Sequence, residues 1–156
     1  MARTRVAAIL GAFKGAFESK GWHGHTVLES IRGVTEAQAC RKPGGAHHSI
    51  HQLLDHIEYW EAMGIHYVRT GGPGRLDRRD WSPPAGSLAA SLRRLKATHK
   101  ALVAAVARLK EADLDRKVRT ISAGSRPLVD VLLGIVAHDA YHAGQIRLMR
   151  TLLPRR

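Results

Sequence analysis

Hydrophobic residues recur along this chain at intervals of three and four, the spacing that places them on one face of an α-helix. Residues 3–19 carry such a pattern, and Gly21 ends it. A stronger pattern of about twenty residues follows Ser49, another runs from Ser87 to about Lys110, and the last extends to about Leu153. No strand-like alternation persists anywhere along the chain, so four long helices account for the pattern.

Polar residues at the starts of helical segments can satisfy the free N–H groups there. Ser or Thr followed three residues later by Glu or Gln forms such a capping box. Three boxes occur, at Thr26 with Glu29, Thr35 with Gln38 and Ser49 with Gln52. The first two predict short helices between the first two long ones, and Ser125 is expected to cap the last helix, with Pro127 in its first turn.

These segments predict an all-α fold, an antiparallel four-helix bundle with short extra helices between the first two long helices. The 156 residues, 44% of them hydrophobic, suffice for a single domain with its own core, which we expect to span residues 1–156. Residues 70–86 are rich in Gly and Pro and predict a long loop.

The chain is expected to work in the cytoplasm. No apolar run is long enough to span a membrane, and the first residues do not resemble a signal peptide. Cys40 is the only cysteine, so no internal disulfide can form, as is usual in a reducing compartment. We expect Cys40 to be a small packing residue.

The chain is strongly basic, with 25 Lys and Arg against 13 Asp and Glu and a formal net charge of +12. Such a charge favours anionic partners, among them nucleic acid, phosphorylated metabolites and acidic thiols. The basic residues are scattered singly and in pairs, and aromatic residues that could stack on bases make up only 5% of the chain. This distribution argues against specific nucleic-acid binding.

Three histidines are predicted to point into the bundle core. His138 and His142 lie four residues apart on the last helix, so their side chains are neighbours on its surface. Advancing roughly 100° per residue places both on the apolar sector that a bundle buries. The same construction on the helix after Ser49 turns His56 toward the core.

A second pair with the same spacing, His47 and His51, is not expected to bind an ion together. His47 precedes the helix, and His51 falls on its outer face with Asp55 and Glu58.

Burying three imidazoles requires partners, because an unpaired buried polar group costs about 1–3 kcal/mol. One divalent ion bound by His56, His138 and His142 would satisfy all three. Alternatively, each could hydrogen-bond to a separate carbonyl or hydroxyl group. Three neutral nitrogen ligands would leave coordination positions open to water or substrate, the pattern of a catalytic site, and would suit zinc, nickel or iron.

Four stretches of the sequence form a pattern that extends over essentially the whole chain. They are WHGHTVLESIRGVTEAQA, HHSIHQLLDHIEYWE, DW in the long loop and HDAYHAGQI, of which the last, with LLDHI, is the most specific. Through these stretches the chain resembles the DinB/YfiT-like family of small four-helix bundles. In that family a histidine of the second bundle helix and an HxxxH pair of the last helix hold a divalent metal. These positions correspond to His56, His138 and His142.

The resemblance implies a metal-dependent enzyme acting on a small molecule. Characterised relatives include bacillithiol transferases and a mycothiol-dependent maleylpyruvate isomerase, and many members are described as metal-dependent hydrolases. A low-molecular-weight thiol as co-substrate suits such a site, because a bound cation lowers the pKa of a coordinated thiol or water. The alternatives are a metal-binding stress protein without turnover and, from charge alone, a basic module that binds nucleic acid.

The sequence identifies no catalytic base, but five residues are candidates for the surroundings of the site. Glu61 and Asp139 could accept an imidazole N–H or lie on the surface as solvated carboxylates. Gln145 could orient a ligand or bond across helices, and His23 could contact substrate or make loop contacts. His99 is expected to be a hydrogen-bonded core histidine.

The side of the last helix that faces away from the histidines is also apolar. It carries Val129, Leu133, Val136, Ala140 and Ala143. Such a stripe would face water in a monomer, so we expect a homodimer, unless residues 21–26 or the long loop cover it within one chain.

Overall fold

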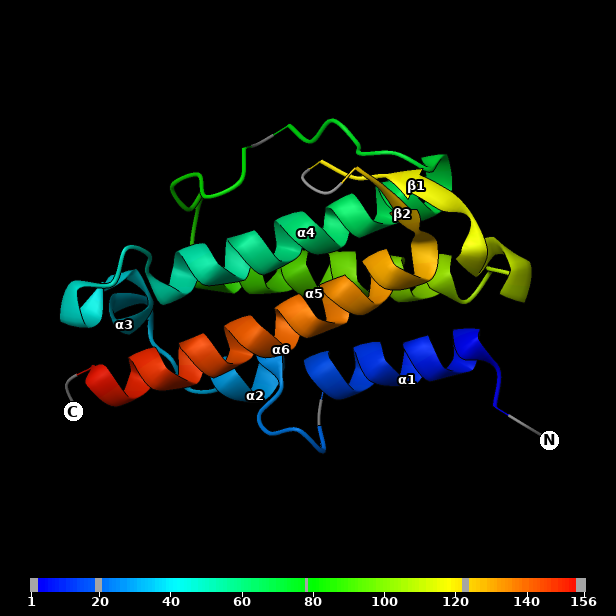
Figure 1. The fold of residues 1–156 in the computed structure, drawn as a ribbon. Helices are drawn as coiled ribbons and strands as arrows, with labels where there is room; N and C mark the ends of the chain where they lie inside the picture. The colour runs from blue at the N-terminus through cyan, green and yellow to red at the C-terminus, as the bar shows by residue number, and fades with distance from the viewer. Residues whose placement is uncertain (1–2, 19–20, 78, 122–123, 154–156) are drawn as a thin grey trace.

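Four long helices pack side by side in the computed structural model, which describes residues 3–18, 21–77, 79–121 and 124–153 (Figure 1). They are α1 (Arg5–Phe17), α4 (Ile50–Thr70), α5 (Leu88–Val106) and α6 (Leu128–Leu152). Two short helices, α2 (Val27–Ile31) and α3 (Glu36–Cys40), and a 3₁₀ turn at Pro43–Gly45 connect α1 to α4. The predicted all-α bundle is therefore confirmed. None of the helices described is both long and apolar enough to cross a membrane.

α4 and α5 run in the same direction, which refines the expected antiparallel arrangement. Near their starts His51 bonds to Ser91, and further along both helices Glu61 bonds to His99. Residues 71–87 therefore return along the length of the bundle instead of making a tight turn, and α6 runs opposite to α4 (Figure 1). The long loop is thus a consequence of the helix order.

The starts of the helices follow the capping chemistry in all but one case. The boxes at Thr26, Thr35 and Ser49 are all formed. The predicted cap at Ser125 is wrong, because Ser125 belongs to a two-stranded antiparallel sheet of β1 (Lys117–Arg119) and β2 (Ser125–Pro127). The N–H of Leu128 at the start of α6 donates to the carbonyl of Arg116 instead. Strands of three residues are too short to show as alternation in the sequence.

The outward orientation predicted for one face of α4 is also wrong. His51, Asp55 and Glu58 are all buried, because α5 packs over them. Polar residues of α5 supply the partners, through the pairs His51 with Ser91, Asp55 with Arg94 and Glu58 with Thr98. A polar helix face can therefore be covered by another polar face, which the periodicity of one helix does not reveal.

The core consists of two hydrophobic clusters separated by a layer of polar side chains. One cluster contains Leu54 and Ile146, and the other contains Met63 and Leu132. Between them α4, α5 and α6 place buried polar residues at the same level, namely His56, Glu61, His99, Asp139 and His142. We call these five residues, together with the partly buried His138, the polar layer.

Gly64 lets α4 pack closely against its neighbours beside the polar layer. A Cβ at this position would lie 2.6 Å from Cδ1 of Ile135 and 3.3 Å from Cδ1 of Leu102. We expect Gly64→Ala to lower the free energy of unfolding by roughly 1–3 kcal/mol, because a buried neighbour must move. Gly15→Ala is the control, since a Cβ there meets no described atom within 4 Å, and it should be stabilising by up to about 1 kcal/mol. Denaturant unfolding measures both, and equal stability of Gly64→Ala and wild type would contradict this packing.

Candidate metal centre

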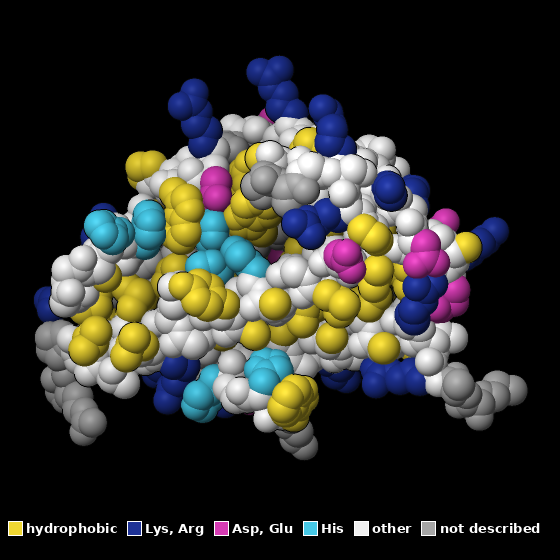
Figure 2. All heavy atoms as spheres, in the orientation of Figure 1, with side chains coloured by type: hydrophobic (Ala, Val, Ile, Leu, Met, Phe, Trp, Pro, Cys, Tyr) yellow, Lys and Arg dark blue, Asp and Glu magenta, His cyan; other side chains and the backbone are white. Residues whose placement is uncertain are grey.

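Three histidine Nε2 atoms meet between α4 and α6. Nε2 of His138 lies 3.0 Å from Nε2 of His56 and 3.1 Å from Nε2 of His142. The spacing of four residues on α6 and the inward face of α4 bring them together, as the sequence predicts. Figure 2 shows histidine side chains gathered in a hollow that hydrophobic side chains border. We call these three residues the triad.

The second ring nitrogen of two triad histidines is held by an acceptor. Nδ1 of His56 donates to Oδ1 of Asp80 at 2.5 Å, and Nδ1 of His142 donates to Oε1 of Gln145 at 2.6 Å. Carboxylate and amide oxygens accept hydrogen bonds, so both Nδ1 atoms carry the proton. Both Nε2 atoms are then unprotonated in the neutral rings, with their lone pairs directed at the centre of the triad.

This arrangement of lone pairs calls for a cation. Nε2 of His138 can donate a proton to only one of its two neighbours, so at least one pair of facing nitrogens is left without a hydrogen between them. Two nitrogens bound to one ion at about 2.1 Å and at roughly right angles lie about 3.0 Å apart, which is the spacing found here. The donor set is therefore compatible with one divalent ion.

Burial favours the neutral, metal-binding form of His142. Burial, assisted by the nearby His138, lowers the pKa of His142 to about 4. Burial alone would raise the pKa of Asp80, but its hydrogen bond with His56 and the N–H of Trp81 hold that pKa below its ordinary value. Asp80 therefore remains a carboxylate that orients His56.

Asp80 and Trp81 belong to the long loop and are absent from the site residues that the sequence predicted. Asp80 also accepts from Nε1 of Trp60 at 3.2 Å. The ring of Trp81 stacks on His56 and, with its other face, on His48, with 3.7 Å between ring centroids in each case. Trp81 has a left-handed backbone with φ 58°, a strained conformation that often marks functional loops. The available signal was the DW pair in the family resemblance.

Glu61, His99 and Asp139 extend the polar layer behind the triad. Glu61 and Asp139 are completely buried, so neither is a solvated surface carboxylate. Oε1 of Glu61 lies 2.6 Å from Nδ1 of His99, which confirms His99 as a hydrogen-bonded core histidine, and Oδ1 of Asp139 lies 3.8 Å from Nδ1 of His138. Burial raises the pKa of both carboxyl groups and lowers the pKa of His99 to about 4. Burial thus disfavours charge on both Glu61 and His99.

The remaining two candidates lie in different surroundings. Gln145 bonds to His142 and is held in turn by the hydroxyl oxygen of Tyr141, to which its amide donates at 2.9 Å. His23 is exposed and lines another hollow, between α1 and α6, with Leu133.

Two hollows adjoin the triad. One of ≈ 540 Å³ is bordered by His142, Tyr141, Trp81 and residues 43–48. The other, of ≈ 360 Å³, is bordered by His138 and Arg126 among others. A small molecule in either hollow would lie beside an ion held by the triad.

Comparison with known proteins identifies one family. A family model described as the DinB superfamily matches residues 22–146, which include the triad and Asp80. No curated protein and no solved structure matches the chain.

Proposed function

The chain belongs to the DinB superfamily, and from this premise we propose that it binds one divalent ion at His56, His138 and His142 and acts as a metal-dependent enzyme on a small molecule. The observation that carries the proposal is that three Nε2 atoms meet and that at least one pair of them has no hydrogen between its two nitrogens. Three protein ligands leave positions open to water or substrate, as in catalytic rather than structural sites.

The reaction that fits best is transfer of a low-molecular-weight thiol, or hydrolysis, in the cytoplasm. A bound ion would lower the pKa of a coordinated thiol or water, so that the nucleophilic anion exists near neutral pH. Asp80 and Gln145 hold His56 and His142 in the tautomer that binds metal, and Trp81 covers one face of His56. The hollows beside His142 and His138 offer room for a thiol and a second substrate. Zinc, nickel and iron all suit three imidazole ligands.

Single alanine substitutions of the triad should each remove one equivalent of bound divalent metal. Asp80→Asn should keep the ligands but lower metal affinity by about 10- to 100-fold, because it weakens the bond that orients His56. Asp77→Asn, which changes an exposed carboxylate of the same loop, is the control and should leave affinity unchanged. Elemental analysis and competition with a chelator measure both. Full metal content in all three alanine variants would show that the ligands are assigned wrongly.

Turnover should require both the ion and a small thiol or an activated water. A screen that pairs low-molecular-weight thiols with electrophiles and hydrolysable esters should find activity that chelation removes and added metal restores. Turnover by chelated protein at the rate of the loaded protein would rule out metal-dependent chemistry. Tight metal binding without turnover in the whole screen would favour a metal-binding stress protein instead.

We also propose that two copies pair through α6. The predicted outer stripe is partly covered within the chain, because α1 and α2 pack on α6 and Ala143 is buried, but Leu133 remains 46% exposed. Exposed apolar side chains continue along the helix at Tyr141, Leu148 and Leu152. Leu133 and Leu148 lie at equal distances from the midpoint between residues 140 and 141. An antiparallel pairing would therefore place Leu133 of one copy against Leu148 of the other, as a two-fold contact requires.

Light scattering at micromolar concentration should give a mass of about 34 kDa, twice the 17.1 kDa of one chain. Leu133→Arg should shift the mass toward 17.1 kDa, because it places a charge in the paired surface. Ile121→Arg, at an apolar residue that is 54% exposed elsewhere, is the matched control and should leave the dimer intact. A wild-type mass of one chain at every concentration would contradict the pairing.

A further inference from the structure

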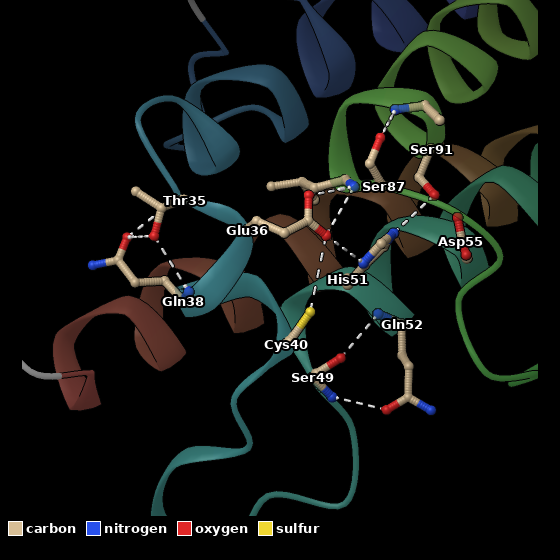
Figure 3. A network of polar contacts seen from close by, with 12 residues as sticks. Thr35, Glu36, Gln38, Cys40, Ser49, His51, Gln52, Asp55, Ser87 and Ser91 are labelled. Atoms are coloured by element: carbon tan, nitrogen blue, oxygen red, sulfur yellow. Dashed lines mark hydrogen bonds and ion pairs between the residues drawn. The ribbon is translucent and has the colours of Figure 1, made fainter.

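A second group of metal-ligating side chains lies where α3 and the starts of α4 and α5 meet. Glu36, Cys40 and His51 bring a carboxylate, a thiol and an imidazole together, and one ligand atom of each lies within 4.8 Å of the others. Oε1 of Glu36 is 4.0 Å from Sγ of Cys40 and 3.7 Å from Nδ1 of His51. Figure 3 shows the three side chains pointing toward one another.

The buried member of this group has one nitrogen without a hydrogen bond. His51 is only 1% exposed, and its Nε2 lies 2.9 Å from Oγ of Ser91. Among the described residues, Nδ1 faces the Glu36 carboxylate at 3.7 Å, which is beyond hydrogen-bond length. Oγ of Ser91 also accepts from Arg94 at 3.1 Å, which fixes that oxygen in place. The imidazole is therefore held with Nδ1 aimed at Glu36 and Cys40.

The Glu36 carboxylate is also held in place. Its Oε2 and Oε1 accept from the N–H of Leu88, the first residue of α5, at 2.8 and 3.1 Å. A carboxylate oxygen has more than one lone pair, so this bond leaves acceptor capacity facing Cys40 and His51. Glu36 and Cys40 are exposed, so water can reach the open side of the group.

We propose that Glu36, Cys40 and His51 bind one thiophilic divalent ion such as Zn²⁺, with water as the fourth ligand. Two ligands of a tetrahedral ion bound at about 2.0–2.3 Å lie roughly 3.3–3.8 Å apart. The distances of 4.0 and 3.7 Å from Glu36 to Cys40 and to His51 are within a few tenths of an ångström of this range. A donor set of thiolate, imidazole and carboxylate binds zinc in preference to magnesium or calcium. On binding, Sγ forms a bond to the ion and its proton goes to solvent.

Such an ion would link the two ends of the segment that forms one side of the hollow beside His142. Cys40 ends α3 and His51 lies in the first turn of α4, so the ion would close the segment 41–50 into a clamped loop. Residues 43–48 of this segment border that hollow, and His48 stacks on Trp81. Occupancy would thus fix the wall of the cavity, whatever reaction the triad carries out.

Titration with Co²⁺ separates this site from the triad. Cys40 is the only cysteine of the chain, so a thiolate-to-cobalt charge-transfer band in the near ultraviolet reports this site alone. The band should appear in the wild type and in His56→Ala, and it should be absent from Cys40→Ser. Because its appearance does not require the triad, the result is independent of the proposed function.

Two further variants test whether the thiol acts together with its neighbours. Loss of a residue that only orients a ligand lowers metal affinity by roughly tenfold or more, and loss of a ligand should lower it at least as much. His51→Gln and Glu36→Gln should therefore each need at least about tenfold more Co²⁺ to develop the band. Glu36 is exposed, which keeps this test valid if the buried His51 variant is unstable. The exposed His47→Gln is the control and should titrate like the wild type. Uptake of Co²⁺ by the wild type without a thiolate band, or a band that Glu36→Gln leaves unchanged, would overturn the proposal.

Discussion

The structure depends on a layer of buried polar groups that crosses the middle of the bundle. Hydrophobic clusters on both sides of the layer stabilise the packed helices. Each buried polar group of the layer still needs a hydrogen-bond partner or a bound ion, because burying an unpaired polar group costs free energy. Within the layer Oε1 of Glu61 is hydrogen-bonded to Nδ1 of His99, whereas Oε2 of Glu61 and Nε2 of His99 have no hydrogen-bond partner among the described residues. The triad differs, because Asp80 and Gln145 take up the Nδ1 protons of His56 and His142 and leave lone pairs facing one another. A cation is the partner that this part of the layer lacks among protein groups.

The path of the chain explains how the loop comes to serve the site. Because α4 and α5 run parallel, their connection must return along the bundle, and in doing so it passes the middle of α4 (Figure 1). Asp80 and Trp81 lie on this return path, where one bonds to His56 and the other stacks on it. The strained backbone of Trp81 is maintained by contacts on both ring faces and by the bond from its N–H to Asp80. A short turn between the helices would have left His56 without either residue.

The sequence predicted the helices and the triad because both depend on local spacing. Three of the helix starts followed from capping boxes, and the inward direction of His56, His138 and His142 followed from rotation about a helix axis. It did not predict Asp80, because a loop has no periodicity that relates it to a helix far away. The outward direction expected for His51 was wrong for a related reason, since the position of α5 decides whether a polar face of α4 meets water. The burial of Glu61 and Asp139 likewise depends on neighbouring helices.

The central claim is that Nε2 of His56 and of His142 carries a lone pair and no proton, and that one ion joins these atoms to His138. Long-range ¹H–¹⁵N correlation spectra of the histidine rings measure this directly, because they distinguish protonated, unprotonated and metal-bound nitrogens. The account predicts protonated Nδ1 and unprotonated Nε2 for His56 and His142, and Nε2 signals of all three residues that shift together and saturate at one equivalent of Zn²⁺ at this site. Protonated Nε2 atoms in His56 and His142, or Nε2 signals that Zn²⁺ leaves unchanged, would contradict it.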